Sequence, residues 1–180
     1  ELEGGLASTA EAANPLAILS EHSKVTLMGE GGIGSERAGT LDARLFRPGS
    51  ANFVDAVHSP EGSQTGITTH LSWNTRKAGN KIEALFRKVT NGKAGDPVWL
   101  TAEEANDAVV GYPEYYNDNG SPKEATVRVN KNGKVTTVPA KEVQYIIPSG
   151  RSMFDHTSNA ALFLANTHPT RGMMAGKHMT

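Results

Sequence analysis

The strongest local constraint on the fold of this chain is an Asn-Gly dipeptide at residues 132–133. Apolar and polar residues alternate on both sides of it, over residues 125–130 and 135–138. Alternation with a period of two is typical of a strand with one buried face, and Asn-Gly favours the two-residue turn between antiparallel strands. The sequence therefore predicts a β-hairpin here. A second Asn-Gly, at residues 91–92, follows the strand-like run Phe86–Thr90 and predicts another tight turn.

Glycine and proline limit how much of the remaining chain can be helical. The 180 residues include 19 glycines and 9 prolines, and only 37% of the residues are apolar. Such a composition favours many turns over long helices, and we expect partner chains to complete the core. The sequence therefore predicts a loop-rich α+β fold, with an antiparallel β-rich part that begins near residue 72.

Local patterns also predict short helices and further strands. Thr101 and Glu104 have the spacing of a capping box, which starts a helix. A helix is predicted over residues 155–166, with Asp155 or Thr157 as its cap. Its inward-facing residues would be Ala160, Leu162, Phe163 and Leu164. Shorter signals predict a helix within residues 1–13 and strands at 25–28, 45–46, 53–54 and 143–147.

The charge balance is unlike that of a free-standing nucleic-acid binder. Lys and Arg total 18 against 19 Asp and Glu, a net charge of −1, whereas such binders carry a basic excess that neutralises phosphates. Near nucleic acid, other chains would have to supply much of the positive field. The absence of cysteine excludes disulfides and thiolate metal sites. We expect a soluble intracellular protein, because no apolar run approaches a membrane span and no signal-peptide pattern opens the chain.

Gly29, Gly31 and Gly34 spell G-x-G-x-x-G after a predicted strand, and Asp55 follows at roughly the spacing of a dinucleotide-binding fingerprint. That fingerprint needs a helix packed behind its third glycine to receive the pyrophosphate. Glycine and polar residues instead follow Gly34. We therefore favour a loop whose backbone approaches a partner closely, with a cofactor loop as the lesser alternative.

Other single residues carry weaker signals. The six histidines are never spaced three or four residues apart, and none has a neighbouring carboxylate at a helical ligand offset that would make a strong site, so zinc is not expected. Arg171 is flanked by apolar and small residues. It is either a surface charge or a planar guanidinium directed at a phosphate, and periodicity leaves both possibilities open.

Three blocks carry a resemblance that covers nearly the whole chain. They are Asn14–Ser20 with Gly29–Gly39, Ser59–Gly62 with Gly66-Ile67, and Ser158–Met179. In order and spacing they resemble the N-P-L run and fork loop, the T-P-E-G turn and the R-x-L-M-G-x-N-M block of the β subunit of multisubunit DNA-directed RNA polymerases. A strand like the family's Y-R-K-V-x-x-G lies between the second and third blocks.

The resemblance implies a nucleotidyltransferase that is active only as an assembly. Residues 1–71 would be the fork and active-centre-proximal region, 72–150 an outer β-rich domain, and 151–180 a return segment to the catalytic core. Its partners would be a β′-like subunit, other β-like subunits, the DNA template, the RNA product and nucleoside triphosphates, with no membrane. The β′-like subunit would hold Mg²⁺, because the family's N-A-D-F-D-G-D cluster is absent here. This chain would then carry no catalytic or metal-binding residue of its own.

The resemblance also implies site residues by position. Arg171 matches the family arginine that contacts the incoming triphosphate, and Lys177 stands where the family has asparagine near the same site. The residues expected near nucleic acid are Lys24 on the hybrid path, Gly31, Gly32, Glu36 and Arg37 in the fork loop, and Glu61 near the active centre.

Departures from the family pattern indicate a divergent phage enzyme with split subunits, located in the host cytoplasm or in the virion. Ser35 and Phe53 replace family arginines. The positions of the rifamycin pocket hold Ser8, Thr9, Glu11, Glu21 and Thr26. The chain begins at Glu1, so we expect an excerpt or a processed product. The alternative interpretation is a non-catalytic structural or virion protein that retains a polymerase-like segment, and a nucleotide-binding oxidoreductase is a more distant one.

Overall fold

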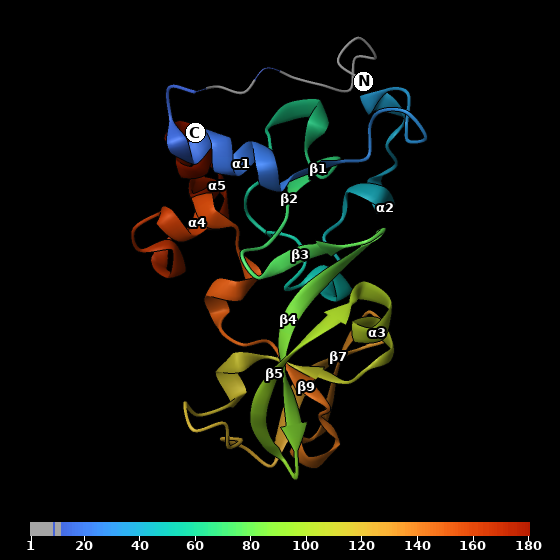
Figure 1. Ribbon diagram of the computed structural model, residues 1–180, viewed down its shortest axis with the longest axis vertical. Coiled ribbons are helices and arrows are strands. Elements are labelled where there is room, and N and C mark those ends of the chain that lie inside the picture. The colour runs from blue at the N-terminus through green and yellow to red at the C-terminus, as the bar shows by residue number, and fades with distance from the viewer. Residues whose placement is uncertain (1–8, 10–11) are drawn as a thin grey trace. The chain divides into compact units, whose positions relative to one another are not determined.

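The computed structural model describes residue 9 and residues 12–180, which form two compact units (Figure 1). Unit 1 combines the described part of Glu1–Phe46 with Val54–Leu71 and Phe154–Thr180, and unit 2 combines Arg47–Phe53 with Ser72–Met153. The mixture of helices and antiparallel sheets confirms the expected α+β fold. The helix predicted within residues 1–13 lies almost wholly outside the described residues. None of the described helices is long and apolar enough to cross a membrane.

Unit 2 is built on a seven-stranded sheet. Its strands are β3 (Thr75–Ala78), β4 (Lys81–Thr90), β5 (Lys93–Thr101), β6 (Val110–Gly111), β7 (Thr126–Lys131), β8 (Lys134–Pro139) and β9 (Tyr145–Ile146). The order is β3-β4-β9-β6-β7-β8, with β5 also paired to β4. All pairs are antiparallel except β6 with β9. Helix α3 (Ala102–Asp107) begins at the predicted capping box, in which Thr101 and Glu104 each accept the other's backbone N–H.

Both Asn-Gly turns predicted from the sequence join adjacent strands. Asn91 and Gly92 link β4 to β5 with φ of 53° and 76°. Asn132 and Gly133 link β7 to β8 with φ of 51° and 70°. The two-residue hairpin turn needs positive φ at both central positions, and Asn followed by Gly adopts it at the lowest steric cost. These two hairpin predictions are confirmed.

The segment 47–53 packs with the sheet of unit 2. Asn52 is fully buried, and its side-chain amide donates to Leu85 O at 2.8 Å. The ring of Phe53 packs on that of Phe86 with centroids 5.7 Å apart. Elsewhere in this unit a hydrophobic cluster is formed by Ala94, Val109, Tyr116, Val127, Val129, Val138, Ala140, Val143 and Ile146.

Unit 1 packs short helices beside a two-stranded sheet. Its elements are α1 (Pro15–Ser23), β1 (Lys24–Thr26), α2 (Leu41–Arg44), β2 (Thr68–His70), α4 (His156–Ala160) and α5 (Pro169–Met179). Strands β1 and β2 are antiparallel, and α4 packs against both α1 and α5. Asn14 caps α1 through the Leu16 N–H and also donates to Met179 O at 2.6 Å. Segments far apart in sequence are therefore joined in this unit.

Three predictions from apolar patterns were wrong, and one of them is the strand at 53–54, where Val54 makes only an isolated bridge to Leu71. Helix α4 begins at the predicted cap, Asp155, but ends at Ala160, and the side chains of Leu162 and Phe163 are 84% and 78% exposed. Within the described residues no apolar surface covers them, so burial does not extend the helix. Leu45-Phe46 forms no strand and is exposed after α2. Single 3₁₀ turns lie at Glu36–Ala38, Pro48–Ser50, Gly62–Gln64, Pro113–Tyr115, Ala140–Glu142, Gly150–Met153 and Leu164–Asn166.

Candidate functional site

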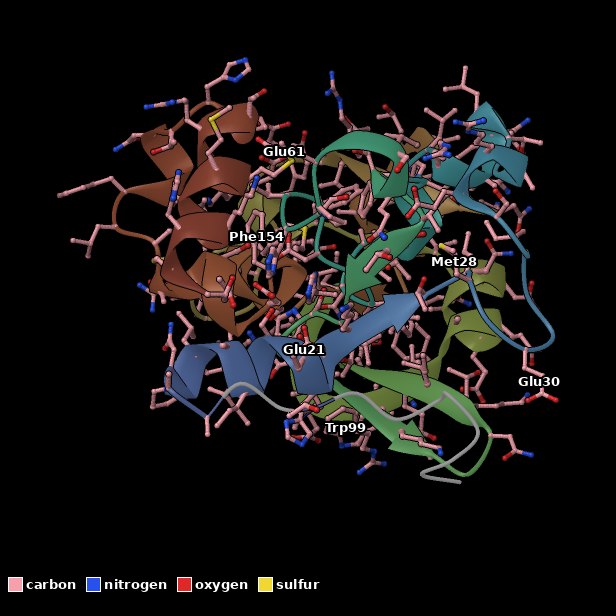
Figure 2. All side chains as sticks on the ribbon, turned by 90° about the horizontal axis from the view of Figure 1, so that it is seen from above. Glu21, Met28, Glu30, Glu61, Trp99 and Phe154 are labelled. Carbon is pink, nitrogen blue, oxygen red and sulfur yellow. The ribbon has the colours of Figure 1, made fainter. Side chains whose placement is uncertain are left out.

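The six charged residues and two glycines that the sequence marks as site residues all lie in unit 1. Two of them form an ion pair, because Lys177 Nζ lies 2.8 Å from Glu61 Oε2 across 116 positions of sequence. Lys177 lies in the last turn of α5, and Figure 2 shows Glu61 beside the C-terminal helices. The hydrogen bond from Lys177, and then its charge, lower the pKa of the Glu61 carboxyl. The carboxylate is therefore ionised at neutral pH.

Arg171 lies in the first turn of α5 and is exposed. Among the described residues its hydrogen-bond acceptor is the sulfur of Met174, 3.4 Å from Nη1. A thioether is a weak acceptor, so the guanidinium keeps most of its five donors available. Six positions of α-helix place Arg171 and Lys177 about 120° apart around the axis of α5. The structure thus brings Glu61 to Lys177, while Arg171 faces another side of the same helix.

Arg44, which the sequence did not single out, organises the chain around Glu36. Its guanidinium donates to the backbone carbonyls of Glu36 (2.6 Å), Gly39 (3.2 Å), Ser63 (2.5 Å) and Thr65 (3.0 Å). The Glu36 carboxylate accepts from the Ser63 hydroxyl and the Gln64 amide. These two hydrogen bonds and the Arg44 charge lower the pKa of Glu36. No local pattern marks Arg44, because two of its partners lie 19 and 21 positions away.

The glycine-rich loop of residues 29–34 folds back on its own base. Gly32 has to be glycine, because a Cβ there would lie 2.2 Å from Leu27 O. Gly31 has φ of +81° and open space around it. Figure 2 shows Glu30 at the outer end of this loop, away from the Glu61 ion pair. The loop therefore presents backbone at its tip, but the tip does not meet α5.

Lys24 and Arg37 are exposed basic residues at the two ends of this region. Lys24 opens β1 and pairs with Glu21 at 3.4 Å. Arg37 lies in the 3₁₀ turn Glu36–Ala38, whose cap is the Ser35 hydroxyl. That turn is only three residues long. The helix on which a dinucleotide fingerprint would place its pyrophosphate is therefore not formed here.

A buried polar cluster lies next to the turn that carries Glu61. His58 Nδ1 donates to Asp155 Oδ2 at 2.5 Å, and the His58 and His70 rings stack with centroids 3.7 Å apart. Asp55 Oδ1 accepts from the His58 N–H at 2.9 Å, and its Oδ2 accepts from the Asp155 N–H at 2.7 Å. All four side chains are buried. The sequence gives no sign of this cluster, because Asp55 and Asp155 are 100 positions apart and no local spacing joins them.

Burial determines how this cluster is charged. Burial lowers the pKa of His70, and the neighbouring His58 lowers it further. Burial raises the pKa of Asp55 and outweighs the hydrogen bonds that this carboxyl accepts. Burial also acts to raise the pKa of Asp155, but the His58 side chain and the Ser158 N–H together leave that pKa below its ordinary value. Asp155 therefore carries the negative charge to which His58 donates.

The distance between His58 Nδ1 and Asp155 Oδ2 in this cluster is that of a hydrogen bond and is too short for a metal site. His58, His70 and Asp155 offer ligand atoms within 4.8 Å of one another. Tetrahedral zinc, with bonds of about 2.0–2.1 Å, holds its ligand atoms roughly 3.3 Å apart. The Nδ1 and Oδ2 atoms are only 2.5 Å apart, which is a hydrogen-bond distance. Mg²⁺ prefers an octahedral shell of oxygens, and this group, the one metal-capable group among the described residues, does not supply it.

Unit 2 contains an open cavity of about 690 Å³. Arg87, Tyr112, Tyr116 and Asp118 are among the residues that line it, and none of the predicted site residues does. The Arg87 guanidinium already donates to the backbone carbonyls of Gly95 and Ala94.

Comparisons with known proteins point to one family. Residues 8–76 match the family model described as RNA polymerase Rpb2, domain 3. The chain is similar to the protein named DNA-directed RNA polymerase subunit beta from Tropheryma whipplei (strain TW08/27), with 30% identity over 165 residues. The proteins of that name from Leifsonia xyli subsp. xyli and Synechococcus sp. (strain CC9902) are 31% and 29% identical. Each comparison covers 89% of this chain but only 14% or 15% of the relative, so the chain spans about one seventh of the length of the relatives it matches.

Proposed function

The chain belongs, as a segment, to the β-subunit family of DNA-directed RNA polymerases, and from this premise we propose that it works inside a multisubunit polymerase. There it lines the path of the RNA–DNA hybrid next to the active centre and contacts the incoming nucleoside triphosphate. The assembly, not this chain alone, carries out template-directed nucleotidyl transfer. Residues 72–150 then serve as outer scaffold, and residues 151–180 return to the catalytic core.

The observation that carries this proposal is the convergence of Glu61 and Lys177 in unit 1. They come from two different blocks of the family pattern, yet they make a 2.8 Å ion pair. An exposed lysine paired with an exposed carboxylate can exchange that partner for a phosphate at little cost, since water screens the charges of an ion pair at the surface. Arg171, on the same helix, has a planar fork of donors that suits a triphosphate.

The nucleic acid would pass the other end of unit 1. Lys24, Gly31, Gly32, Glu36 and Arg37 are proposed to lie near it. The backbone of Gly31 is open to a close approach, because a Cβ there would meet no atom within 4 Å. Glu36 keeps its segment in place through the Ser63 and Gln64 contacts, so its role is to position the fork loop.

The remaining partners come from other chains. Polymerases of this kind use Mg²⁺, and the described residues here do not suit it. We place the metal on a β′-like subunit, with further β-like subunits, DNA and RNA completing the site. Ser35, Phe53 and Lys177, which depart from the family pattern, support a phage-encoded enzyme with split subunits, located in the host cytoplasm or in the virion.

Isolation of the assembly tests this function. We expect the tagged chain to be isolated from its native source with a subunit that carries the N-A-D-F-D-G-D cluster, and the complex to extend RNA on a DNA template. Mass spectrometry of the partners and nucleotide incorporation measure the two outcomes. Isolation in a particle that incorporates no nucleotide would instead support the non-catalytic structural or virion protein.

The rifamycin-pocket positions predict drug insensitivity. Glu21 is an exposed carboxylate on α1 that pairs with Lys24, and Thr26 is exposed on β1. Thr9 is also exposed, and Ser8 and Glu11 lie outside the described residues. The acidic Glu21 and the missing family side chains remove the shape and hydrogen bonds that the drug needs. We expect the purified enzyme to transcribe at the same rate with and without micromolar rifampicin, while a cellular polymerase assayed in parallel stops. Strong inhibition would contradict this interpretation.

A further inference from the structure

We propose that His58 is a positioning residue whose hydrogen bond to Asp155 holds the Glu61 turn against helix α5. The effect of His58 on nucleotide use rests on the proposed function, because the elements held together carry Glu61, Lys177 and Arg171. The contacts of His58 themselves do not depend on that function. In the family's E-T-P-E-G pattern a glutamate stands at the position of His58, so the resemblance does not supply this role.

The cluster joins two segments that the chain separates widely. His58 and Asp155 are 97 positions apart, and all of unit 2 except the segment 47–53 lies between them in sequence. The link is threefold. The His58 side chain donates to Asp155 at 2.5 Å, the Asp155 N–H donates to Asp55 at 2.7 Å, and Asp55 accepts the His58 N–H at 2.9 Å. A ring of three hydrogen bonds therefore joins Asp155, the N-cap of α4, to the residues just before the Glu61 turn.

Each end of this ring leads directly to the candidate site. Asp155 Oδ1 accepts the Ser158 N–H at 2.7 Å and so caps α4, which packs against α5. His58 lies three positions before Glu61 and touches α5 itself. A Cβ added to Gly176 would lie 3.5 Å from His58 Cδ2. Gly176 directly precedes Lys177, so the imidazole lies against the part of α5 that carries the residue paired with Glu61.

Imidazole suits this place better than another core side chain. Asp155 is fully buried, and a buried carboxylate needs hydrogen-bond donors to remain ionised. His58 supplies one from Nδ1, and its flat face covers His70 with an angle of 6° between the rings. A purely apolar side chain could fill the volume but would leave the carboxylate without that donor. The role is thus geometric, and the distance between Glu61 and α5 depends on it.

Three variants in the assembled polymerase separate positioning from simple packing. His58→Phe keeps an aromatic ring but removes the donor. His58→Asn removes the ring but keeps an N–H₂ near the place of Nδ1. Asp155→Asn serves as a milder second variant in case His58→Phe fails to assemble. We expect His58→Phe to raise KM for nucleoside triphosphates roughly 5- to 10-fold with little change in kcat. In His58→Asn, KM should stay close to that of the parent enzyme.

A crosslinking measurement makes the test independent of the reaction. The chain has no cysteine, so Glu61→Cys with Lys177→Cys introduces a single reactive pair in it. We expect a short bis-maleimide to join this pair quickly when position 58 is His or Asn, and slowly when it is Phe or when Asp155 is Asn. Equal crosslinking rates in all these backgrounds would overturn the positioning role, as would stoichiometric zinc in the purified protein. If crosslinking is slowed but KM is unchanged, His58 does position the Glu61 turn, and the result counts against the proposed contact with nucleotide.

Discussion

Replacing Arg171 by alanine in the proposed polymerase assembly is expected to lower kcat/KM for nucleoside triphosphates about 10- to 150-fold, because a hydrogen bond to a charged group contributes about 1.5–3 kcal/mol. Within the described residues the guanidinium makes only a weak hydrogen bond, to the Met174 sulfur. The substitution therefore removes little that stabilises α5, and its main effect is to weaken the binding of the nucleotide. Promoter binding should stay close to that of the parent enzyme, since this residue is not proposed to contact DNA.

Two matched variants sharpen this prediction. Arg171→Lys keeps the charge but loses the planar fork, so it should recover only part of the activity. Arg128→Ala also removes an exposed arginine, from β7 in unit 2, and should leave nucleotide use unchanged. Elongation rates measured at limiting and at saturating nucleotide give the two kinetic constants. Unchanged elongation of Arg171→Ala at limiting nucleotide would remove this residue from the nucleotide site.

The elements that could be predicted from the sequence are those determined by neighbouring residues. Asn91-Gly92 and Asn132-Gly133 form the expected hairpin turns because their positive φ angles are a property of the dipeptide itself. Thr101 starts α3 because its capping box needs only Glu104, three positions away. In each case the atoms that make the structure lie within a few residues of one another.

The features that could not be predicted depend on partners far along the chain or outside it. The helix predicted over residues 155–166 ends at Ala160, since Leu162 and Phe163 find nothing apolar to cover them in the described chain. The pairing of Glu61 with Lys177 and the buried contact of His58 with Asp155 span 116 and 97 positions. Hydrophobic periodicity carries no information about such pairs. Only the family resemblance indicated that Glu61 and Lys177 belong to one region.

Arg44 leads to the second large effect, which concerns stability rather than chemistry. Arg44→Met keeps the aliphatic stem but leaves the Glu36, Gly39, Ser63 and Thr65 carbonyls without their donor. Methionine cannot replace a guanidinium that serves four acceptors at once. The Glu36 carbonyl keeps the Gly39 N–H at 3.2 Å, but the Gly39, Ser63 and Thr65 carbonyls lose the Arg44 donor and must turn to water. Gly66 shows how tightly the segments meet, since a Cβ there would lie 2.3 Å from Arg44 O. The segment 36–39 and the segment 63–66 should therefore separate more easily in the variant.

Hydrogen exchange in the assembled enzyme measures this separation. We expect Arg44→Met to weaken local closure by about 2–3 kcal/mol, which speeds amide exchange about 30- to 150-fold in residues 36–39 and 63–66. Arg37→Met is the matched control, because it removes an exposed arginine from the same segment without breaking these bonds. Exchange in the hairpins of unit 2 should not change in either variant, since the four carbonyls that accept from Arg44 all belong to unit 1. Equal acceleration by both substitutions would mean that the charge of the segment, not the hydrogen bonds of Arg44, keeps the two segments together.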